Sequence, residues 1–64
     1  MQVRDLLDLL YRDGWYVDRT RGSDRQLKHP SKRGLVTVAG KPGDEVAPAT
    51  LQSIRRQAGL GRGR

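Results

Sequence analysis

The spacing of the apolar residues changes twice along this chain, and these changes constrain its fold more than any other feature. Near the N-terminus they recur at intervals of three and four, the period of an amphipathic helix. These positions are Val3, Leu6, Leu7 and Leu10. From Trp15 to Val38 the pattern changes to short runs typical of strands, and a helical stripe returns at Leu51, Ile54 and Ala58. The expected order of elements is therefore α-β-β-β-α.

Glycine and proline residues mark the expected helix ends. Gly14 suits the position directly after a first helix over about residues 2–13, because glycine readily adopts the left-handed conformation found there. Pro48 suits the first turn of a second helix, where its missing N–H is not needed. Gly59 should stop that helix, with Leu60 folding back onto the last turn in a Schellman motif.

Three short strands are expected between the helices, at residues 15–20, 25–29 and 35–39. Gly22-Ser23 predicts a turn between the first two strands. Pro30 cannot donate to a strand ladder, so the second strand should end by His29. The strands should then form an antiparallel meander.

The alternation of side chains predicts which residues face the core. Trp15 and Val17 share one face of the first strand, with Arg19 in line. The inward residues of the other strands are Leu27, Val36 and Val38. The opposite face, with Tyr16, Asp18 and Gln26, should stay in solvent, and Tyr16 is the better placed aromatic for stacking. Two helices covering one face of a three-stranded antiparallel sheet make a two-layer α+β domain.

The size and composition exclude several classes of protein. With 64 residues and no cysteine, the chain can form one small domain without disulfides or thiolate metal sites. No stretch is apolar enough for a membrane span or a signal peptide, so we expect a cytoplasmic protein. One histidine and scattered carboxylates lack metal-ligand spacing, and we expect no metal or other cofactor. We assign residues 1–60 to the domain and residues 61–64 to a flexible basic tail.

Positive charge is concentrated in the middle of the chain. Between Arg19 and Arg33 six basic residues accompany one acidic residue, Asp24. A polyanion responds to such a local excess, which predicts phosphate binding. The alternatives are a solvated basic surface without a partner and a charged edge that prevents sheet aggregation. The expected phosphate contacts are Arg21, Ser23, Arg25, Lys28, Lys32 and Arg33.

Five short motifs follow one another along nearly the whole chain. They are Asp13-Gly14-Trp15, Gly22-Ser23, Lys28-His29-Pro30, Val36-Thr37-Val38 and Gln57-Ala58-Gly59-Leu60. In order and spacing they resemble the HicA family of bacterial toxins, the mRNA interferases of type II toxin–antitoxin pairs. The resemblance implies a fold like that of double-stranded-RNA-binding domains and cleavage of mRNA without a metal. It also implies a HicB-like antitoxin that masks the active face. If the resemblance holds, the phosphates that these residues contact are those of RNA.

The chain departs from this family at its catalytic position. The family normally has a histidine directly after the Gly-Ser pair, and here that position holds Asp24. A histidine has an ordinary pKa of about 6.5, so it can accept and donate protons near neutrality. An aspartate stays ionised, donates poorly to the leaving 5′-oxygen and repels the phosphate. We therefore expect Asp24 to impair ribonuclease activity.

Two questions stay open at this point. His29 could replace the missing catalyst or contact a phosphate, or it could be a structural residue at the entrance of the loop. The family keeps a His-Pro pair here besides its catalytic histidine, which favours the structural interpretation. The chain could be an impaired ribonuclease toxin, or a non-catalytic protein of the same fold that binds RNA or the antitoxin. A DNA-binding module is disfavoured because the second helix has only Arg55 and Arg56 as obvious phosphate contacts.

Overall fold

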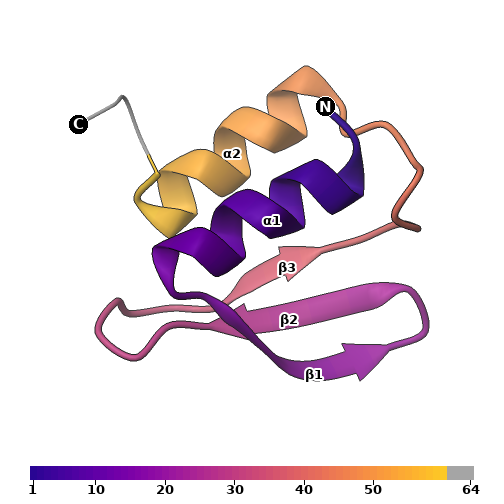
Figure 1. Cartoon of the computed structure of the whole chain (residues 1–64). Coiled ribbons are helices and arrows are strands. Elements are labelled where there is room, and N and C mark those ends of the chain that lie inside the picture. Colours follow the sequence, from indigo (N-terminus) through magenta and orange to yellow (C-terminus); the bar gives the residue numbers. More distant parts are fainter. Residues whose placement is uncertain (61–64) are drawn as a thin grey trace.

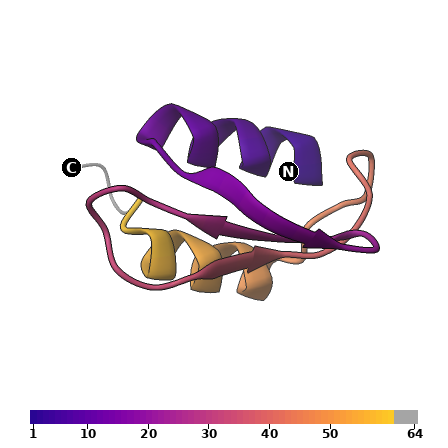
Figure 2. The same ribbon diagram turned by 90° about the horizontal axis from the view of Figure 1, so that it is seen from below.

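A computed structural model describes residues 1–60, with five elements in the expected order. Helix α1 spans Val3–Asp13 and helix α2 spans Pro48–Ala58. Strands β1, β2 and β3 span Tyr16–Arg21, Asp24–Lys28 and Val36–Val38 and form one antiparallel sheet in the order β1-β2-β3. Both helices lie on one side of this sheet (Figure 1). Seen from below, the strands run in front of the helix layer (Figure 2). The expected two-layer α+β fold is confirmed.

Two further expectations concern the C-terminal tail and membrane-spanning segments. The basic tail expected at residues 61–64 lies outside the described residues. No helix within residues 1–60 is long and apolar enough to cross a membrane.

Both helices end in the Schellman motif that their glycines predict. At the end of α1, Gly14 has a φ of 107°, and the N–H of Trp15 donates to the carbonyl of Leu10. At the end of α2, Gly59 has a φ of 68°, and the N–H of Leu60 donates to the carbonyl of Arg55. These bonds satisfy carbonyl groups that a helix end leaves free.

One core joins the helices to the covered face of the sheet. Its eleven buried side chains are Val3, Leu6, Leu7, Leu10, Trp15, Leu27, Val36, Val38, Val46, Ile54 and Ala58. Within residues 1–60 no polar or charged residue is buried with them. The inward positions expected in β2 and β3 are therefore confirmed, whereas Val46, in the loop before α2, was not anticipated.

Strand β1 departs from the expected alternation. Val17 pairs with Leu27, whereas Arg19 pairs with Gln26, because Asp18 is an extra residue in a β-bulge. Leu27 faces the core and Gln26 faces the other side, so the prediction that Arg19 lies in line with Val17 is wrong. All six residues of β1 are exposed, Val17 to 37%, since β1 is the edge strand farthest from the helices (Figure 1).

The end of α1 provides a test of this packing. A Cβ atom added at Gly14 would lie 2.8 Å from Nε2 of His29, whereas one added at Gly34, which has a φ of 90°, meets nothing within 4 Å. Gly34→Ala should lower the free energy of unfolding by about 1 kcal/mol through backbone strain alone. Gly14→Ala adds overpacking and should cost about 2 kcal/mol or more. Urea unfolding followed by Trp15 fluorescence measures both, and equal losses would contradict the close contact.

Candidate nucleic-acid interface

Basic side chains gather on the face of the sheet that the helices do not cover. In an antiparallel sheet, paired residues share a face and successive residues alternate between faces. Leu27 is completely buried under the helices, so its neighbours in β2 point to solvent. Together with their partners in β1 they form a surface that we call the open face: Tyr16, Arg19, Arg21, Asp24, Gln26 and Lys28.

Asp24 lies at the edge of the open face where β2 begins. It follows the Gly22-Ser23 turn directly, is exposed, and pairs with Arg21 in the strand register. Within residues 1–60, no ion pair shorter than 4 Å involves its carboxylate. The side chain at position 24 is therefore available to a ligand and has no evident task in the fold.

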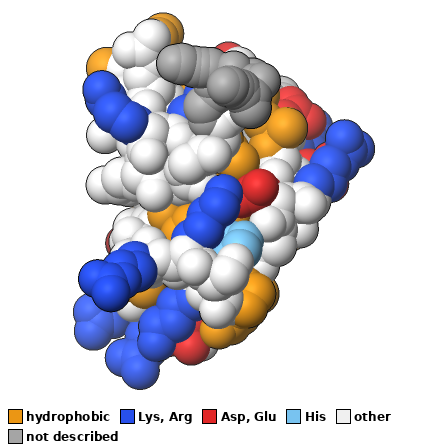
Figure 3. Space-filling view, turned by 90° about the vertical axis from the view of Figure 1, so that its left-hand side faces the viewer, with side chains coloured by type: hydrophobic (Ala, Val, Ile, Leu, Met, Phe, Trp, Pro, Cys, Tyr) orange, Lys and Arg blue, Asp and Glu red, His pale blue; other side chains and the backbone are white. Residues whose placement is uncertain are grey.

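The expected phosphate contacts do not all lie together. Arg21 and Ser23 are exposed beside Asp24 at the β1–β2 turn, and Lys28 lies on the open face about 13 Å further along β2. Arg33 is exposed in the β2–β3 loop at the opposite end of the sheet (Figure 1). Figure 3 faces that end of the domain and shows basic side chains gathered over its lower half.

Two of the residues expected to contact phosphate, Arg25 and Lys32, form hydrogen bonds within the domain. Arg25 is half-buried, and its Nη1 donates to the carbonyl of Gly40 over 3.2 Å. Lys32 donates from Nζ to Oδ2 of Asp13 over 2.5 Å and to the carbonyl of Ala58 over 3.0 Å. A cation at this place also complements the negative C-terminal end of α2. Lys32 thereby ties the β2–β3 loop to both helix ends.

Arg19 belongs to the open face although it was not among the expected contacts. Regular alternation would place it on the covered face with Val17, and the bulge at Asp18 moves it opposite Gln26. Its place within the basic segment 19–33 is the one sequence signal that could have included it.

His29 is held inside the domain by both of its ring nitrogens. The side chain is 8% exposed, and its ring meets that of Trp15 edge to face with centroids 5.2 Å apart. Nδ1 accepts from the backbone N–H groups of Ser31 and Lys32 over 3.0 and 3.1 Å. An accepting nitrogen carries no hydrogen, so we assign the hydrogen to Nε2, which donates to the carbonyl of Asp13 over 2.7 Å. This geometry supports the structural interpretation of His29.

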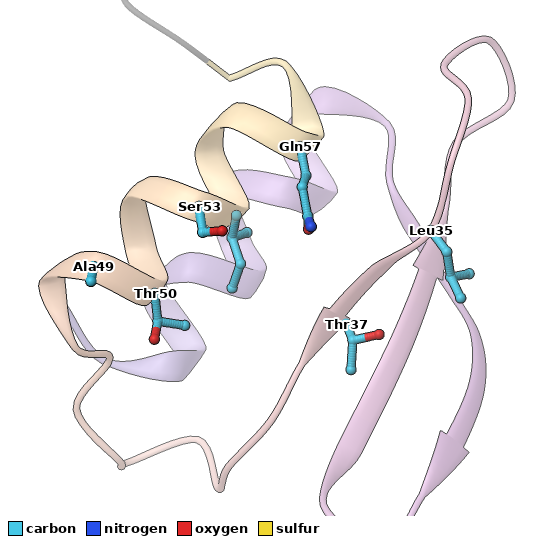
Figure 4. A pocket seen from close by; sticks show the side chains of 7 residues that line it. Leu35, Thr37, Ala49, Thr50, Ser53 and Gln57 are labelled. Carbon is cyan, nitrogen blue, oxygen red and sulfur yellow. The ribbon is translucent and has the colours of Figure 1, made fainter.

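A groove of about 420 Å³ separates β3 from α2 but lacks groups for catalysis (Figure 4). It is lined by Leu35, Thr37, Ala49, Thr50, Ser53, Ile54 and Gln57. None of these side chains is charged or exchanges protons readily near neutrality. Within residues 1–60 no three carboxylate or imidazole groups converge as potential metal ligands. The open face is the candidate site because it brings position 24 together with exposed basic side chains.

Substitutions at the neighbouring residues Lys32 and Arg33 can distinguish a structural role from a role in binding. We expect the structural role for Lys32 and the binding role for Arg33. Lys32→Met should lower the free energy of unfolding by about 1–2 kcal/mol, because it removes a charged hydrogen bond that is partly screened by solvent. Arg33→Met removes an exposed charge and should leave stability unchanged while weakening RNA binding. Thermal unfolding and RNA titration of both variants test this assignment. Unchanged stability of Lys32→Met would show that its contacts contribute nothing to the fold.

Comparison with known proteins identifies the family of this chain. The sequence model of one family, described as HicA toxin of bacterial toxin-antitoxin, matches residues 3–60. No curated protein matches the chain. HicA toxins are mRNA interferases that pair with an antitoxin. Since the match covers both helices and all three strands, this chain belongs to the HicA toxin family.

Proposed function

We propose that this chain is the toxin of a HicA-type toxin–antitoxin pair, that its open face binds mRNA, and that Asp24 makes it a poor ribonuclease. The observation that carries the proposal is the place of Asp24. It follows Gly22-Ser23, as the family's catalytic residue does, and it is exposed beside Arg21 on the open face. A non-catalytic protein that binds RNA or the antitoxin would use the same surface, and it would differ in having no residual cleavage.

The chemistry explains why an aspartate is a poor substitute at this position. RNA breaks when its 2′-oxygen attacks the adjacent phosphorus, which closes a cyclic phosphate and expels the 5′-oxygen. The 2′-hydroxyl loses a proton and the 5′-oxygen gains one, so a group that exchanges protons near neutrality serves both steps. An ionised carboxylate about 4 Å from a phosphate charge instead adds roughly 1–4 kcal/mol of repulsion, depending on solvent exposure.

His29 is poorly placed to replace the missing histidine. Its Nδ1 holds the backbone of the β2–β3 loop, and its Nε2 holds the end of α1. Catalysis would require at least one of these nitrogens to leave its partner. The ring also packs on the buried Trp15, whereas position 24 faces solvent on the other side of the sheet.

We also propose that a HicB-like antitoxin covers the open face. A surface with Arg19, Arg21 and Lys28 is best complemented by an acidic partner, which also accelerates encounter. Asp24 introduces a like charge into that contact, with Arg21 next to it. Because RNA and antitoxin would then use the same side chains, each should exclude the other.

Replacement of Asp24 tests the catalytic assignment. Asp24→His should raise cleavage of a mixed RNA pool by roughly 10²-fold, because it restores a group that transfers protons near neutrality. Asp24→Asn is the matched control, since it removes the negative charge without supplying that group. It should bind RNA more tightly than the parent chain and leave the cleavage rate low. Gel analysis of end-labelled RNA and growth after induced expression measure both effects.

Two other outcomes would contradict the assignment. Equal cleavage by the parent chain and Asp24→His would mean that position 24 is not the catalytic position. Equal stimulation by Asn and His at this position would mean that charge repulsion, and not proton transfer, limits the reaction.

The basic residues of the open face should control the binding of both RNA and antitoxin. Arg19→Gln and Arg21→Gln should each weaken RNA binding and lower the slope of log affinity against log salt by about 0.7, the value for one phosphate contact on a single strand. Arg56→Gln, which changes an exposed arginine of α2, is the control and should have little effect. Purified antitoxin should displace labelled RNA. A complex that holds both ligands at once would rule out masking of the open face.

A further inference from the structure

Tyr16 is an exposed aromatic residue with no evident structural task. Its residue surface is 49% exposed, whereas the adjacent Trp15 is 2% exposed and packs against His29. Within residues 1–60 the Tyr16 ring makes no aromatic pair and its hydroxyl makes no hydrogen bond. The exposed half of the residue therefore offers an apolar surface to a ligand.

The surroundings of Tyr16 suit a charged strand. Lys28 is its partner in the sheet, and the Lys28 side chain is half-exposed although its Nζ lies 3.7 Å from Oδ2 of Asp18. Arg19 lies further along β1 on the same open face. A ring flanked by cations can hold a base by stacking while the cations hold the adjacent phosphates.

We infer that the open face binds single-stranded RNA and that one unpaired base stacks on Tyr16. This inference rests on the proposed RNA binding and specifies its substrate class. In an A-form duplex every base is paired and stacked between its neighbours, so an aromatic side chain on a flat sheet cannot reach a base face. In a single strand the bases can be splayed out, and stacking on an aromatic side chain is available to any of them.

The charge along α1 agrees with this choice. The exposed residues of α1 include Asp5 and Asp8, and Asp8 is paired with Arg12 over 3.0 Å. This surface has no excess of positive charge, so a duplex gains little from lying along α1. Helix α2 presents the exposed Arg55 and Arg56 on that side of the domain, so the preference for the sheet rests on the exposed ring beside its cations and not on charge alone.

The position of Tyr16 separates base binding from catalysis. Its partner Lys28 lies four residues from Asp24 along β2, which is about 13 Å. A base on Tyr16 thus lies well away from the group at position 24, and Tyr16 would fix where the strand crosses the sheet. In the Asp24→His background, loss of the ring should raise KM and leave kcat nearly unchanged.

A matched pair of tyrosines makes the stacking testable. Tyr11 is 46% exposed on α1, almost as much as Tyr16. With a short fluorescent oligouridine, Tyr16→Leu should weaken binding about fivefold to 150-fold, the range for loss of one stacked base. Tyr16→Phe keeps the ring and should keep the affinity, and Tyr11→Leu should behave like the parent chain. Because no charge is lost, the salt slope should be the same for all four proteins.

A second measurement reports stacking directly. A 2-aminopurine placed in the oligouridine should lose fluorescence on binding to the parent chain and to Tyr16→Phe, but not to Tyr16→Leu. An RNA duplex of the same length should bind more weakly than the single strand and should not distinguish these variants. Unfolding curves establish that each variant is folded.

The outcomes separate this inference from the proposed function. Tighter binding of the duplex than of the single strand, or equal affinities of Tyr16→Leu and Tyr11→Leu, would overturn the stacking site while leaving RNA binding intact. If the parent chain binds neither RNA in a salt-dependent way, the proposed function itself fails.

Discussion

The chain has enough apolar side chains to cover one face of its sheet. A domain of this size buries only about 60% of the surface of its unfolded chain. Within residues 1–60 there is no further helix or sheet that could cover the other face of the sheet. Both helices place their apolar stripes on the same side, over Leu27, Val36 and Val38. Because successive residues of a strand alternate between faces, burial of these three forces their polar neighbours into solvent. The open face with its basic side chains is thus a direct consequence of how the core is built.

A second set of contacts holds the helices to the β2–β3 loop. The Schellman end of α1 places the carbonyl of Asp13 where Nε2 of His29 can donate to it, and the same ring packs on Trp15. Lys32 continues this connection to the last carbonyl of α2. Two motifs that are far apart in the sequence, Asp13-Gly14-Trp15 and Lys28-His29-Pro30, therefore form one structural unit. This unit employs the single histidine in the fold, and our proposal therefore assigns the catalytic position to residue 24.

Because Asp24 is exposed, our proposal allows activity to change without a change in the fold. The side chain makes no ion pair with residues 1–60 and lies outside the core, so its identity has little effect on packing. Under our proposal, a change from histidine to aspartate removes proton transfer and adds repulsion, while Arg19, Arg21 and Lys28 remain available to RNA or to an antitoxin. Such a protein would keep the binding properties of its family and lose most of its chemistry.

The order of the elements, both helix ends and the Gly22-Ser23 turn could be predicted from the sequence, because each depends on residues only a few positions apart. The motif around position 24 could be recognised for the same reason. Only the tertiary structure decided which basic residues share a surface with Asp24. One extra residue in β1 moves Arg19 to the open face, and contacts with Asp13 and Ala58, 19 and 26 residues away, draw Lys32 to the helix ends. A bulge depends on how one strand fits against another, and a long side chain turns toward whichever partner the fold brings near, so neither is encoded in local spacing.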